Sequence, residues 1–124
     1  MSQEKFPENI ERMLEGFAAR EVARIEEIRI NQGDEAWAQA IGSSIVTQLT
    51  LQHIEKTPND GYLAEQGRRT LLALTPQFAL LHSHPTLGHG SSAGMIEELA
   101  SRGYINLDVN KLIGARWRKD GNRT

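Results

Sequence analysis

The spacing of apolar residues near the start of this chain constrains its fold more than any other feature. Between residues 7 and 30 the apolar side chains recur three or four positions apart: Ile10, Met13, Leu14, Phe17, Ala18, Val22, Ile25 and Ile28. An α-helix turns once every ~3.6 residues, so this spacing places them on one face. Pro7 suits a first helical position, where its missing N–H would have no partner. The pattern predicts a helix from Pro7 to about Ile30, roughly 35 Å long at ~1.5 Å per residue.

A second long helix is predicted from Asp34, as its N-cap, to about Glu55. Its apolar row is spaced by four, at Trp37, Ile41, Ile45 and Leu49, with His53 next in the row and expected to be partly buried. Gly33 separates the two helices, and residues 57–61, Thr-Pro-Asn-Asp-Gly, are typical of a turn. The short link between the helices predicts an antiparallel hairpin over residues 7–56.

The remaining residues predict three or four shorter helices over 60–118, followed by a basic tail over 119–124. The expected segments are 62–74, with Leu63, Leu71, Leu72 and Leu74 facing inward, then 91–103 and 107–117. Residues 77–83 form a short apolar run that fits either a buried helix or a strand. A chain of 124 residues forms one domain, because cores divide only beyond ~250–300 residues. We therefore expect a single all-α domain.

Composition excludes several classes of function. The chain has no cysteine, which rules out disulfides, thiolate metal sites and a thiol nucleophile. Its net charge of −2 rules out a uniformly basic coat for nucleic acid, although residues 1–60 hold eleven acids and six bases and the rest is net basic. The polar start resembles no signal peptide and no window is apolar enough for a membrane span, so a cytoplasmic protein is expected.

A histidine cluster raises the possibility of a metal site. His82, His84 and His89 lie close together in the sequence, and neutral imidazole is the commonest metal ligand in proteins. If residues 77–84 form a strand, His82 and His84 share a face and can bind one ion. If the segment is helical, the two side chains point about 200° apart and cannot.

The basic end of the chain suggests a second alternative, nucleic-acid binding. Residues 74–81, Leu-Thr-Pro-Gln-Phe-Ala-Leu-Leu, and residues 96–105, Ile-Glu-Glu-Leu-Ala-Ser-Arg-Gly-Tyr-Ile, resemble pieces of winged-helix regulators of the MarR type, although here they stand about one helix closer together. That resemblance implies a DNA-binding helix followed by a basic wing. The residues available for phosphate contact or base stacking are Arg116, Trp117, Arg118, Lys119 and Arg123.

The first expectation for function is a non-enzymatic interaction or regulatory module that associates with itself. No nucleophile with its base, phosphate loop or paired carboxylates is evident in the sequence, and no cofactor is implied. The long first helix is expected to extend beyond the shorter helices and to leave apolar surface for a protein partner, most simply a second copy in a homodimer. The predicted partner-binding residues are Phe17, Val22, Ile25, Ile28, Trp37 and Ile41.

Overall fold

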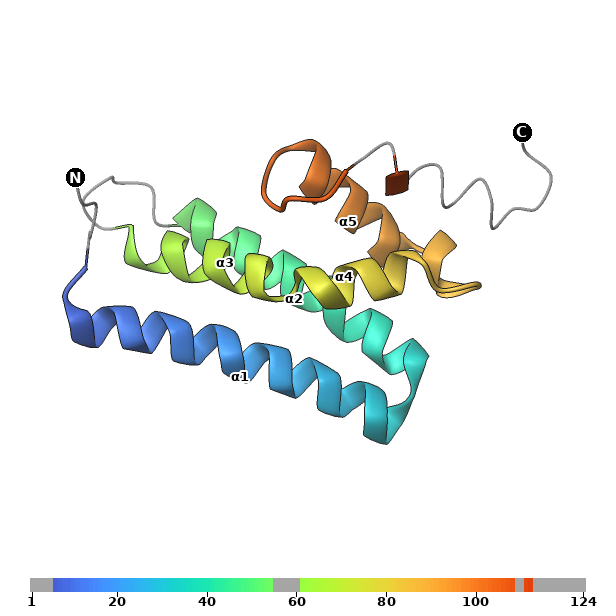
Figure 1. Ribbon diagram of the computed structural model, residues 1–124, viewed down its shortest axis with the longest axis horizontal. Coiled ribbons are helices and arrows are strands. Elements are labelled where there is room, and N and C mark those ends of the chain that lie inside the picture. The colour runs from blue at the N-terminus through green and yellow to red at the C-terminus, as the bar shows by residue number, and fades with distance from the viewer. Residues whose placement is uncertain (1–5, 55–60, 109–110, 113–124) are drawn as a thin grey trace.

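Two long helices dominate the computed structural model, which describes residues 6–54, 61–108 and 111–112. They are α1 (Glu8–Gln32) and α2 (Asp34–Ile54), packed together as the predicted hairpin (Figure 1). The shorter elements follow in order: α3 (Tyr62–Ala73), α4 (Thr75–His82), a single 3-10 turn η2 (Leu87–His89), and α5 (Ser91–Ser101). The all-α fold predicted from the sequence is confirmed.

The hairpin turns at a single residue, Gly33. Its φ of 99° lies in the left-handed region that favours glycine. The Gly33 N–H donates to the carbonyl of Arg29, and the Gly33 carbonyl accepts from the N–H of Trp37, both at 3.1 Å. Gly33 therefore closes one helix and opens the next, and Asp34, predicted as the N-cap, is the first helical residue instead. Its carboxylate is free to bind other side chains.

Helices α3 and α4 run beside α1 in the same direction. Near one end of α1, Arg69 of α3 forms an ion pair with Glu11 at 2.7 Å. Further along, the side-chain amide of Gln77 in α4 donates to the carbonyl of Val22 at 3.2 Å. The two contacts occur in the same order along α1 as along α3 and α4, so these helices run in one direction. Helix α2 runs antiparallel to all three. Figure 1 shows α5 on the opposite side of α2 from α1.

The ambiguous run 77–83 is helical through His82, and Ser83 caps the helix. Thr75 and Pro76 begin α4 directly after α3, because proline is favoured in the first turn of a helix. Helix α5 ends before Gly103, whose φ of 84° provides the expected stop. Of the predicted last helix over 107–117, residues 109–110 and 113–117 lie outside the described part of the chain, as does the tail over 119–124.

The core lies along α2, and α1, α3, α4 and α5 all contribute buried side chains to it. Its fully buried side chains include Ile25, Trp37, Ile41, Leu71, Leu74, Phe78, Leu81 and Ile96. The indole N–H of Trp37 is the only polar group of that side chain, and it donates a hydrogen bond to Oε1 of Gln77 at 2.9 Å. Since Gln77 also bonds to α1, one amide side chain joins three helices.

Two burial predictions are wrong, and helical phase explains both. His53 is exposed rather than partly buried. A spacing of four residues drifts about 40° per step on a helix of 3.6 residues per turn, so the row that starts at Trp37 has rotated toward solvent by His53. Leu72 is 41% exposed, because its neighbour Leu71 faces the core and successive helical side chains point about 100° apart.

Candidate functional site

Half of the predicted partner-binding residues belong to the core. Ile25, Trp37 and Ile41 have no exposed surface. The guanidinium of Arg29 also lies over the Trp37 ring, 4.4 Å from its centroid. The prediction that these three residues bind a partner is wrong, because the short helices cover this end of the hairpin and the three side chains belong to the core.

The other three predicted residues lie on α1 at or near the surface. Phe17 is 37% exposed, with the guanidinium of Arg20 5.0 Å from its ring centroid. Val22 and Ile28 are partly buried. Of these three residues, only Phe17 is exposed, and it lies beside a charge.

The clustered histidines have separate partners. His82 ends α4 and is 1% exposed, and its Nε2 lies 2.7 Å from Oε2 of Glu97 on α5. His84 follows α4, and its Nε2 lies 3.0 Å from Oδ2 of Asp34 at the start of α2. The helical form of residues 77–82 thus directs the two imidazoles to different helices.

Both ring nitrogens of His84 bind protein atoms. Nδ1 accepts hydrogen bonds from the backbone N–H groups of Thr86 at 3.2 Å and Leu87 at 3.1 Å. Because Nδ1 is the acceptor, the proton of the ring lies on Nε2, which donates to Asp34. No nitrogen of His84 remains for a metal ion.

A shared metal site at the histidine cluster finds no support in the geometry. His89 is partly buried in η2. Within residues 6–54, 61–108 and 111–112, no group of three histidine, aspartate or glutamate side chains is placed to hold a metal ion. The metal interpretation needed a strand over 77–84, but residues 77–82 are helical and His84 lies beyond the end of α4.

The predicted nucleic-acid contacts cannot be placed. Arg116, Trp117, Arg118, Lys119 and Arg123 all lie outside the described residues. The predicted DNA-binding helix corresponds to α5, which carries Glu97 and Glu98. Glu97 binds His82 and Glu98 pairs with Arg102, so α5 presents no cluster of cations.

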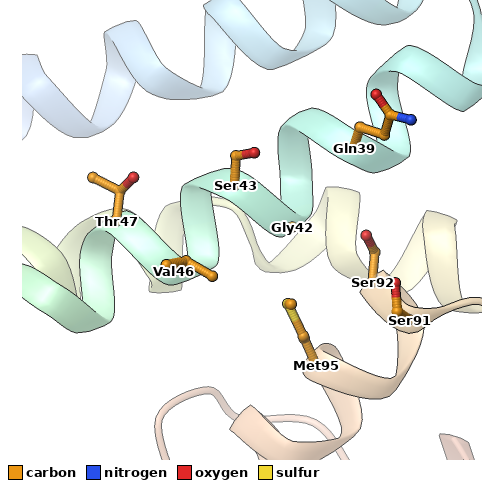
Figure 2. A pocket seen from close by; sticks show the side chains of 8 residues that line it. All are labelled: Gln39, Gly42, Ser43, Val46, Thr47, Ser91, Ser92 and Met95. Atoms are coloured by element: carbon orange, nitrogen blue, oxygen red, sulfur yellow. The ribbon is translucent and has the colours of Figure 1, made fainter.

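A surface groove lies between α2 and α5. We call it the α2–α5 groove. Its volume is about 610 Å³, and it is lined by Gln39, Gly42, Ser43, Val46, Thr47, Ser91, Ser92 and Met95. Figure 2 shows Met95 rising from α5 toward Val46 of α2, with Ser91 and Ser92 at the start of α5. Val46 is 52% exposed, so the groove offers apolar surface to solvent.

The floor of the groove depends on a close approach of two helices. The Ser92 hydroxyl donates to the carbonyl of Ala38 at 2.8 Å. A Cβ added at Gly42 would lie 2.8 Å from the Ser92 Oγ, closer than side chains pack. Gly42 therefore lets the first turn of α5 rest against α2 and fixes the shape of the groove.

A smaller hollow continues the groove toward the beginning of α2. It measures about 330 Å³ and shares Gln39, Ser91 and Ser92 with the larger one. Its other lining residues include Leu87 and Glu35. The two hollows therefore adjoin at these three shared residues.

The groove lining contains no ionisable side chain. The sequence carries the corresponding signal, because no charged residue occurs from Ala36 to Gln52. On α2 the exposed side chains within this run are Gln39, Ser43, Val46, Thr47 and Thr50. The sequence-based prediction did not identify this uncharged face of α2, because it considered the row of apolar side chains on the other face of the helix.

The groove lining is uncharged and of mixed polarity. It offers hydroxyls, one amide and two apolar side chains. No helix in the described part of the chain has both the length and the apolarity to cross a bilayer. No protein family, curated protein or solved structure matches this chain significantly.

Proposed function

We propose that this protein is a non-enzymatic helical interaction module that associates with itself through the α2–α5 groove. The observation that carries the proposal is the uncharged outer face of α2. Between Glu35 and His53, every exposed side chain on that helix is neutral. Protein interfaces are marked by such depletion of charge at their centres, with apolar groups such as methionine enriched.

The first helix of the same molecule shows how a solvated face differs. Exposed positions of α1 carry Arg12, Glu15, Arg20 and Glu26, among other charged residues. Arg12 pairs with Glu8 and Arg24 with Glu21 along that surface. Charged side chains keep a helix surface hydrated, so their absence from the outer face of α2 favours a contact surface there.

A second copy is the partner that this face suits best. Residues 1–60 carry five more acids than bases, so copies of this half repel one another over much of the surface. Contact between the α2–α5 grooves of two copies adds no like-charge repulsion. It also combines an exposed apolar side chain, Val46, with a concavity, as a self-complementary surface requires.

Sedimentation equilibrium of the purified protein tests this proposal. We expect a concentration-dependent dimer, weakened at least about tenfold by Val46→Lys, because two like charges would enter the interface. Leu80→Lys is the matched control: Leu80 is 50% exposed on α4, against 52% for Val46, and lies outside the groove. A monomer at every concentration, or equal weakening by both substitutions, would contradict the proposal.

A further inference from the structure

We propose that two copies pair about a two-fold axis that passes close to Ser43, with their α2 helices antiparallel. This inference rests on the proposed function and adds the orientation and register of the contact. The α2 residues that line the groove extend from Gln39 to Thr47, and Ser43 is midway between them. A two-fold axis there places Ser43 opposite its counterpart and Gln39 opposite the partner's Thr47.

The shape of the face supports this pairing. Val46 projects from the same face that is hollowed beside Gly42, one helical turn away. In this register each Val46 lies opposite position 40 of the other copy, between the groove-lining positions 39 and 42, so each Val46 enters the groove of the other copy. Release of water from the groove would accompany burial of Val46 and Met95.

The polar groups of the face also match themselves. Ser43, Thr47 and Ser91 each carry a hydroxyl, which can donate and accept a hydrogen bond, and Gln39 carries both a donor and an acceptor. Two identical hydroxyls can therefore bond to each other across a symmetric interface. Two identical carboxylates or ammonium groups cannot, and none line this groove.

The exposed Phe17 on α1 suits symmetric pairing less well. Phe17 lies beneath the guanidinium of Arg20. A two-fold axis at Phe17 would bring two arginines together, and like charges in contact oppose association. The uncharged face of α2 has no such penalty.

Disulfide trapping tests the register directly, because the chain contains no cysteine of its own. The full-length protein is prepared as three single variants, Ser43→Cys, Gln39→Cys and Thr47→Cys, and oxidised gently at micromolar concentration. A disulfide requires Cα atoms roughly 4.4–6.8 Å apart. We expect Ser43→Cys to form a covalent dimer, and the Gln39→Cys and Thr47→Cys proteins to cross-link when mixed. Glu15→Cys, at an exposed position on α1, is the control and should stay uncoupled.

The outcomes separate this inference from the proposed function. Cross-linking of Gln39→Cys and of Thr47→Cys each to itself would indicate parallel helices and overturn the inference. A dimer in sedimentation that none of these variants traps would also overturn it, while the proposed function would stand. A protein that is monomeric throughout would overturn both.

Discussion

His84 joins three parts of the molecule through one imidazole ring. Nε2 donates to Asp34 at the corner of the hairpin, and Nδ1 accepts from two backbone N–H groups of the segment that leads to η2. Asp34 in turn pairs with Arg29 at 3.3 Å. The ring therefore ties the loop after α4 to the junction of α1 and α2. That loop continues into Leu87, Gly90 and Ser91, which border the smaller hollow.

Replacing this ring should destabilise the fold measurably. His84→Ala removes an acceptor from the N–H groups of Thr86 and Leu87 and a donor from Asp34, and is expected to lower the free energy of unfolding by about 1–2 kcal/mol. Urea denaturation followed by circular dichroism measures the change. His53→Ala, at an exposed position on α2, should change stability by no more than about 0.5 kcal/mol. Equal losses of stability in the two variants would show that the hydrogen bonds of His84 make no net contribution to the free energy of unfolding.

At the scale of the elements, the contact between α2 and α3 depends on a glycine. A Cβ added at Gly67 would lie 2.5 Å from the backbone carbonyl oxygen of Gln48 and 3.0 Å from Cγ of Gln52. The first of these atoms belongs to a helix backbone and cannot move without shifting α2. Gly67 thus sets how closely the two helices approach.

Two glycine substitutions should therefore act in opposite directions. Gly67→Ala gains up to about 1 kcal/mol in helix propensity but forces the helices apart, and we expect a net loss of about 1–3 kcal/mol. Gly94→Ala, in α5, meets nothing within 4 Å and should stabilise the protein by up to about 1 kcal/mol. Thermal unfolding of both variants checks the prediction. Stabilisation by Gly67→Ala would contradict the close packing.

The sequence predicted the long elements well because their signals are local. The apolar spacing of α1 and the glycine at position 33 determine the hairpin without reference to any other part of the chain. The partner-binding prediction failed at Ile25, Trp37 and Ile41, because which apolar face is covered depends on where α4 and α5 pack. The groove was not predictable for the same reason: its lining comes from two helices about fifty residues apart.

Helical phase accounts for a further gap between sequence and structure. Ser44 and Gln48 are buried, 2% and 6% exposed, although both are polar. As the row of apolar residues spaced by four drifts toward solvent, the row that contains Ser44 and Gln48 rotates inward to replace it. Oε1 of Gln48 has no hydrogen-bond partner there. The interior of this bundle is thus partly polar, which the composition of α2 alone does not indicate.

For the whole molecule, carboxylates held by cations connect the helices and determine the response to acid. Hydrogen bonds from Arg24 lower the pKa of Glu21 from its usual 4.5, and bonds from His84 and Arg29 lower the pKa of Asp34 from its usual 3.8. Burial raises the pKa of Glu65, but bonds from Arg69 and Arg68 outweigh it, so that pKa is also lowered from 4.5. Arg69 additionally holds Glu11, so this network links α1 to α3.

These lowered pKa values predict a protein that loses stability in acid. Because each pKa is lower in the folded state, the unfolded chain binds more protons at acid pH, and the free energy of unfolding falls as the pH falls. The contribution of these groups is complete above their unfolded pKa values, so the loss should begin below about pH 4.5 and continue through the folded pKa values. Urea midpoints measured from pH 7 to pH 3 give the slope of stability against pH and check this prediction. Glu65→Gln and Asp34→Asn should each flatten it, and their effects should add because the two networks share no partner. An unchanged slope in the double variant would mean that other groups control the acid response.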